Sequence, residues 1–109
     1  AIKIYTCSLP LGVHRFIKEM EKENIVSIVC YEANSNVYIY FPDYMRSRIE
    51  GILNRGLQGY KIRYVKENNS RASSAKIMSD DTNKKISCDK VIEIIIEDLR
   101  SYGFIHSIS

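Results

Sequence analysis

The side chains that could perform chemistry are few, and their spacing does not assemble a catalytic or metal site. Cys7 precedes His14 by seven residues. A cysteine nucleophile needs a base in direct contact and a third group that orients the base, and this spacing supplies neither. The three cysteines, Cys7, Cys30 and Cys88, have no C-x-x-C spacing, and neither histidine stands at metal-ligand spacing from a cysteine. We therefore predict a protein that is not an enzyme and uses no metal or cofactor.

Composition predicts a single ordinary core and a cytoplasmic location. The chain has 109 residues, of which 45% are hydrophobic, and an odd number of cysteines. We expect each thiol to be a small buried side chain in a reducing compartment. No apolar run approaches the length of a membrane span. The net charge of +3 permits a polyanionic partner but does not require one.

Hydrophobic periodicity predicts a run of elements in the order strand, helix, strand, strand, helix, strand. They cover residues 2–6, 13–20, 25–31, 37–41, 45–56 and 60–66. A polar turn at residues 34–36 joins the second and third strands as a hairpin. This order predicts an α+β domain over residues 1–66 with the ferredoxin-like split β-α-β fold (βαββαβ). Both helices of that fold cover one face of a four-stranded antiparallel sheet, so we expect the other face to be free.

The remainder of the chain is predicted to be a linker followed by a third helix. Residues 67–86 are rich in Asn, Ser, Asp and Lys and can bury little surface, so we expect a mobile polar linker. Residues 87–109 begin with a helix whose apolar face must dock on the domain or on a partner. One hypothesis is therefore a protein-interaction or homodimerisation module. Its interface residues would be Val91, Ile95 and Leu99.

Two segments resemble the ribonucleoprotein motifs of the RNA-recognition motif family. Residues 4–9, Ile-Tyr-Thr-Cys-Ser-Leu, stand where the family's six-residue motif lies on its first strand, with Thr6 and Ser8 departing from it. Residues 38–41, Tyr-Ile-Tyr-Phe, match the tail of its eight-residue motif, whereas residues 34–36 lack the basic residue, the glycine and the first aromatic residue of its head. The resemblance covers residues 1–66 and implies a ferredoxin-like domain that binds single-stranded RNA on its open sheet face.

Strand parity predicts the same surface without the resemblance. Placing Ile4, Ile39 and Ile62 inward turns the alternate side chains outward. The outward set is Lys3, Tyr5, Asn36, Tyr38, Tyr40, Lys61 and Arg63. Tyrosine rings can stack on bases and cations can meet phosphates.

The first hypothesis is therefore a non-enzymatic module that binds single-stranded nucleic acid, RNA before DNA. Tyr5 and Tyr38 would stand side by side and stack the bases. The alternative also stays open, namely that the C-terminal helix lies on this face and buries both tyrosines as core.

Overall fold

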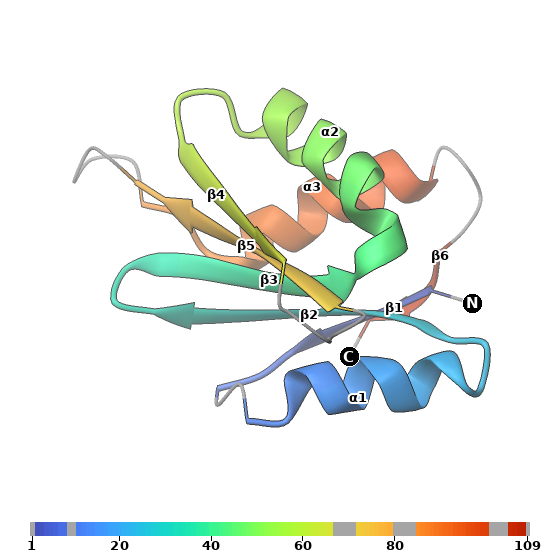
Figure 1. Cartoon of the computed structure of the whole chain (residues 1–109). Helices are drawn as coiled ribbons and strands as arrows, with labels where there is room; N and C mark the ends of the chain where they lie inside the picture. The colour runs from blue at the N-terminus through green and yellow to red at the C-terminus, as the bar shows by residue number, and fades with distance from the viewer. Residues whose placement is uncertain (1, 9–10, 67–71, 80–84, 101–104, 109) are drawn as a thin grey trace.

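The computed structural model describes residues 2–8, 11–66, 72–79 and 85–100, and the backbone of residues 105–108. Its elements follow one another as β1 (Ile2–Thr6), α1 (Val13–Glu21), β2 (Val26–Ala33), β3 (Asn36–Pro42), the 3-10 helix η1 (Asp43–Met45), α2 (Arg46–Gly56), β4 (Lys61–Lys66), β5 (Ala72–Met78), α3 (Cys88–Arg100) and β6 (Ile105–Ile108). These strands form one mixed sheet in the order β4-β5-β3-β2-β1-β6 (Figure 1). The predicted α+β class is confirmed.

The hairpin between β2 and β3 forms where the sequence predicted it. Ala33 lies opposite Asn36, so that Asn34 and Ser35 make a two-residue turn. Both turn residues have positive φ angles, 54° and 66°. A type I′ turn requires this backbone conformation and matches the twist of the strands that it joins.

The strand order differs from that of the predicted split β-α-β fold. A split unit would place another strand between β1 and β2, but here the two are directly paired and parallel, with Tyr5 opposite Val29. β3 pairs with β2 on one side and with β5 on the other. β2 therefore separates Tyr5 from Tyr38, and the prediction that these two tyrosines stand side by side is wrong.

β5 lies inside the segment that the sequence predicted to be a linker. It is hydrogen-bonded to β3 on one side and to β4 on the other. Its inward side chains Ala75 and Ile77 are fully buried. The prediction of a mobile linker is therefore wrong for residues 72–78, whereas residues 67–71 and 80–84 lie outside the described part of the chain. Without β5, the first four strands would not form one continuous sheet.

Helices cover both faces of the sheet, not one as predicted. α2 and α3 lie on one face and α1 lies on the other (Figure 1). A parallel β1-α1-β2 crossover must pass over one face of the sheet, and here that face is the one opposite α2. The smaller core under α1 includes Val13, Ile17, Val29 and Ala72.

The main core lies between the sheet and the pair α2 and α3. From α3 it receives Val91, Ile95 and Leu99, each no more than 1% exposed. The apolar face predicted as an interface is therefore part of the protein's own core, and α3 docks on the domain. It lies opposite the face of Tyr5 and Tyr38, so it does not bury them. None of the described helices is long and apolar enough to cross a membrane.

Candidate nucleic-acid interface

The seven residues predicted to bind nucleic acid share one face of the sheet. Ile4 and Ile39 are buried in the main core, and Ile62 packs against it. Because side chains alternate along a strand, their neighbours point to the face that carries α1. This set comprises Lys3, Tyr5, Asn36, Tyr38, Tyr40, Lys61 and Arg63. The predicted parity is correct, but α1 now divides the face into a covered and an uncovered half.

α1 covers the half of this face where Tyr5 of β1, Val29 of β2 and Tyr40 of β3 lie, together with Ala72 at the start of β5. The ring of Phe16 meets the ring of Tyr5 edge to face, with 5.0 Å between ring centroids. The ring of His14 meets that of Tyr40 in the same way at 5.2 Å. Both tyrosines pack against the small core under α1. Both rings hold α1 on the sheet. This packing makes Tyr5 less exposed to solvent than the sequence predicted.

The uncovered half carries a line of side chains that crosses four strands. The register places Tyr31 of β2 opposite Tyr38 of β3, Tyr38 opposite Lys76 of β5, and Lys76 opposite Arg63 of β4. We call Tyr31, Tyr38, Lys76 and Arg63 the tyrosine-cation row. Side chains directly opposite each other on neighbouring strands interact, so the row is one continuous surface.

The two tyrosines of the row are stacked. Their ring centroids are 4.8 Å apart and their planes differ by 8°. Tyr31 is 9% exposed, whereas Tyr38 is half-buried. Burial, together with a hydrogen bond to Tyr40, raises the pKa of Tyr31 well above its usual value. Tyr31 is therefore a neutral, fixed support behind the more accessible ring of Tyr38.

The cations of the row lie on the other side of Tyr38. Lys76 Nζ is 5.7 Å from the centroid of the Tyr38 ring, which is within the range of a cation–π interaction. Arg63 is exposed at the next position, and Lys61 is exposed further along β4. The row thus runs from a buried aromatic ring to an exposed positive charge at the edge of the sheet.

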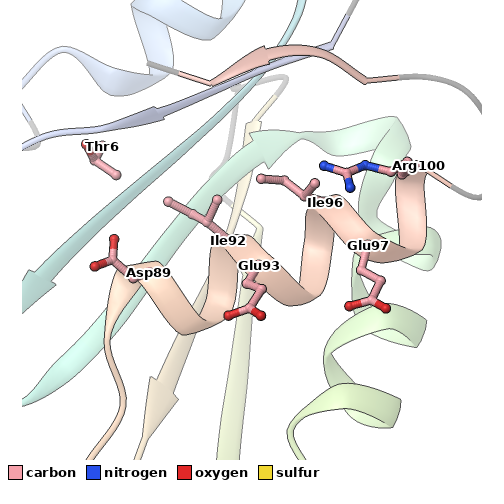
Figure 2. Close-up of a pocket in the computed structure, with 7 residues that line it drawn as sticks. All are labelled: Thr6, Asp89, Ile92, Glu93, Ile96, Glu97 and Arg100. Carbon is pink, nitrogen blue, oxygen red and sulfur yellow. The ribbon is translucent and has the colours of Figure 1, made fainter.

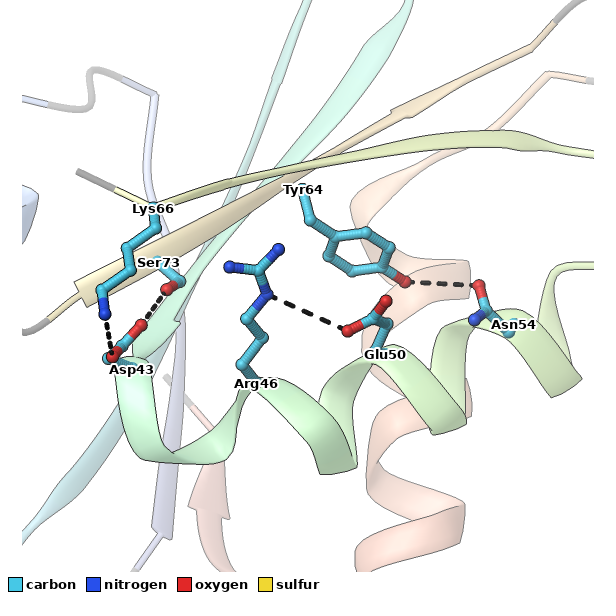
Figure 3. Close-up of polar contacts among 7 residues, drawn as sticks. All are labelled: Asp43, Arg46, Glu50, Asn54, Tyr64, Lys66 and Ser73. Atoms are coloured by element: carbon cyan, nitrogen blue, oxygen red, sulfur yellow. Dashed lines mark hydrogen bonds and ion pairs between the residues drawn. The ribbon is translucent and has the colours of Figure 1, made fainter.

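Polar contacts with α2 and η1 hold the edge strand β4 in place, and η1 is itself bonded to β5 (Figure 3). The Tyr64 hydroxyl donates a hydrogen bond to Asn54 Oδ1 at 3.3 Å. Lys66 Nζ pairs with Asp43 Oδ2 at 3.3 Å, and the Ser73 hydroxyl donates to Asp43 Oδ1 at 2.5 Å. These contacts lie on the α2 side of β4. The side chains of Arg63 and Lys61 therefore project from a strand that is anchored from behind.

A hollow of about 660 Å³ lies on the opposite layer, between α3 and the end of β1. Its lining comprises Thr6, Asp89, Ile92, Glu93, Ile96, Glu97 and Arg100 (Figure 2). Three carboxylates thus follow one another along α3, with one arginine at the end of that helix. Such a surface repels a polyanion. Among the described residues, no cluster of three or more potential ligands could hold a metal ion.

Tyr31 and Lys76 were absent from the set predicted from the sequence. Tyr31 ends the predicted strand 25–31, and the alternation of buried Ile28 and Cys30 places it on the same face as Tyr38. Parity could therefore have found it. Lys76 lies in β5, whose small and polar residues resemble a linker, so no local signal in the sequence placed it beside Tyr38.

No protein-family model matches the chain, and neither the curated proteins nor the solved structures include a significant match to it. The resemblance to the RNA-recognition motif therefore rests on the amino-acid sequence alone. The strands that carry these segments, β1 and β3, are separated by β2.

Proposed function

We propose that this protein is a small module that binds single-stranded nucleic acid, RNA in the first place, across the β3-β5-β4 half of the sheet face. The observation that carries this proposal is the tyrosine-cation row. A stacked aromatic support beside a line of cations offers one site for a base and adjacent sites for phosphates. Base stacking on an aromatic side chain contributes about 1–3 kcal/mol per base.

Tyr38 is the base-stacking residue of this model. One side of its ring is occupied by Tyr31, and the ammonium of Lys76 lies over the ring from the neighbouring strand. A base that stacks on Tyr38 takes the place of the Lys76 ammonium, which then turns to a phosphate. Asn36, on the same face of β3, is placed for contacts with the base edge.

Arg63 and Lys61 extend the path of the nucleic acid to the edge of the sheet. Both are exposed on β4 and point to the same face as Tyr38. The carboxylates of α3 lie in the opposite layer and repel phosphates from that side. The charge distribution therefore favours one face of the molecule for a polyanion. Tyr5 and Tyr40 serve in this model to hold α1, and Lys3 lies outside the path.

The test is a fluorescence-anisotropy titration of a labelled single-stranded RNA pool with the unmodified protein and two variants. Tyr38→Ala should weaken binding by about fivefold or more, because it removes at least one stacking contact. Tyr44→Ala is the matched control, since Tyr44 is 66% exposed on η1, beyond the end of β3 and outside the row. It should bind like the unmodified protein.

Two outcomes would overturn the proposal. One is the absence of binding at low salt by the unmodified protein, where phosphate contacts are strongest. The other is equal affinity of the Tyr38→Ala and Tyr44→Ala variants. A labelled single-stranded DNA pool run in parallel decides between the two kinds of nucleic acid.

The packing of α3 in the core argues against the alternative of a protein-interaction or homodimerisation module. That alternative required Val91, Ile95 and Leu99 to meet a second copy, and these side chains are enclosed in the core of a single chain.

A further inference from the structure

Two cysteine thiols face each other inside the main core. Cys30 lies on β2 and Cys88 is the first residue of α3, 58 positions further along the chain. Their sulfur atoms are 2.8 Å apart. Cys30 is 1% exposed and Cys88 is 7% exposed. The fold has therefore brought together two thiols whose spacing in the chain does not predict a pair.

The surrounding contacts hold the two thiols in register. Glu32 lies two residues after Cys30 on β2, and its Oε1 accepts a hydrogen bond from the backbone N–H of Cys88 at 2.7 Å. The Ser87 hydroxyl accepts a hydrogen bond from the backbone N–H of Lys90 at 3.3 Å, which caps the first turn of α3. The start of α3 is thus fixed to β2 at the position where the sulfur atoms meet.

We propose that Cys30 and Cys88 are a site of oxidative modification, at which a hydroperoxide converts the two thiols into an intramolecular disulfide between β2 and α3. An S–S bond is about 2.05 Å long, so the sulfur atoms need to approach by less than about 1 Å. Cys88 is the more exposed residue of the pair, so we assign the first reaction with hydrogen peroxide to its thiol.

The reaction proceeds in two balanced steps. Hydrogen peroxide oxidises the Cys88 thiol to a sulfenic acid and is itself reduced to one water molecule. The Cys30 sulfur then attacks the Cys88 sulfur, the S–S bond forms, and the sulfenic oxygen leaves as a second water molecule with the Cys30 proton. The protein loses two hydrogen atoms in total, and one molecule of peroxide becomes two of water.

Burial determines the rate of this reaction. Desolvation raises the pKa of Cys30 and that of Cys88 above the usual range of a thiol. Because the thiolate is the reactive form, oxidation should be slow at pH 7 and faster at pH 9. A cysteine at the surface would react faster, but it would form no disulfide without a second thiol beside it.

The test treats the full chain with hydrogen peroxide at pH 7 and pH 9 and follows intact mass and peptide maps without reductant. We expect a loss of two hydrogen atoms per chain and a peptide that joins Cys30 to Cys88. Cys7→Ser is the matched control and should form the same link, because Cys7 belongs to the small core under α1. Cys88→Ala should form none.

A second measurement keeps the proposal falsifiable if the variants fold poorly. A bond that closes a loop of 58 residues should raise the melting temperature of the oxidised unmodified protein by about 10–20 °C, and reductant should reverse the rise. A link that involves Cys7, a gain of oxygen atoms without a link, or no link at pH 9 would overturn the proposal. Affinity for RNA should not change, since the pair lies in the opposite layer from the row.

Discussion

Tyr38 has different neighbours on its two sides, and this asymmetry determines how its ring can be used. The ring of Tyr31 has little room to move away, because Tyr31 is 9% exposed and its ring stacks on both Tyr38 and Tyr40. Lys76 is a long, flexible side chain over the same ring. A ligand can displace the lysine at little cost, but it cannot displace the tyrosine. In the proposed model a base therefore stacks on the side of the Tyr38 ring that faces β5.

The contribution of Lys76 to the proposed RNA binding can be separated from that of any other lysine. Lys76→Gln should weaken binding of single-stranded RNA and lower the slope of log K against log salt by about 0.7, which corresponds to one phosphate contact on a single strand. The measurement is an anisotropy titration over a series of salt concentrations.

Lys90→Gln is the matched control for this experiment. Lys90 also lies over a tyrosine ring, that of Tyr60 at 5.5 Å, but on α3 in the opposite layer. Its replacement should leave both the affinity and the salt slope unchanged. Equal slopes for the Lys76 variant and the unmodified protein would show that Lys76 meets no phosphate.

At the scale of elements, the close approach of α2 and α3 depends on a glycine at the end of α2. A methyl group at Gly56 would overlap the Cγ2 atom of Ile94 on α3. At Gly51, earlier in the same helix, a methyl group would meet only the mobile end of the Arg55 side chain. The two glycines thus differ in whether another element lies against them.

Two alanine substitutions in α2 should therefore have opposite effects on stability. Gly56→Ala should lower the free energy of unfolding by about 1–3 kcal/mol, because it overpacks the contact between two helices. Gly51→Ala should raise it by up to about 1 kcal/mol through helix propensity. Urea denaturation measures both changes. Introducing Ile94→Ala should remove most of the cost of Gly56→Ala, and an unchanged cost in that background would contradict the packing argument.

For the whole molecule, periodicity in the sequence predicted where most elements lie but not how the strands are ordered. The strands 2–6, 25–31, 37–41 and 60–66 and the three helices carry clear apolar patterns. β5 reads Ala-Ser-Ser-Ala-Lys-Ile-Met and has few β-branched residues, so its role as a central strand comes from its neighbours. Pairing between distant strands leaves no local pattern, and the ferredoxin-like order was wrong for this reason.

The same limit applies to the candidate site. Parity along single strands correctly placed Tyr38, Lys61 and Arg63 on one face of the sheet. It could not reveal that α1 covers Tyr5, or that Lys76 lies between Tyr38 and Arg63. These facts depend on which strands are neighbours.

The stability of the molecule should fall as the pH rises above about 9. Burial raises the pKa of Tyr64 to about 12 and raises the pKa of Tyr31, Cys30 and Cys88. Below the usual pKa of each group, both the folded and the unfolded chain hold the proton. Above it, the unfolded chain releases the proton first and is favoured. Urea denaturation of the reduced protein at a series of pH values from 7 to 12 measures the fall.

Two variants separate the contribution of Tyr64 to this fall from the effect of a carboxylate in the same layer. Tyr64→Phe should lessen the decline between pH 10 and pH 12, whatever it does to stability at pH 7. Asp43→Asn, which alters a contact in the same layer, should instead lessen the loss of stability in a urea series extended to acid pH. The Ser73 hydroxyl and Lys66 lower the pKa of Asp43, so the stability that its carboxylate contributes is present above its usual pKa and is lost as the pH falls. The same decline in the Tyr64→Phe variant would contradict the assignment.

The most direct test of the proposed function maps the contact surface. A titration of the ¹⁵N-labelled protein with a single-stranded oligouridine, followed by backbone amide chemical shifts, reports which elements meet the ligand. We predict the largest shifts in β3, β5 and β4, at Tyr38, Lys76 and Arg63, and none at Glu93 or Glu97 of α3. Shifts centred on α3, or no shifts at saturating oligonucleotide, would contradict the proposal that RNA binds along the tyrosine-cation row.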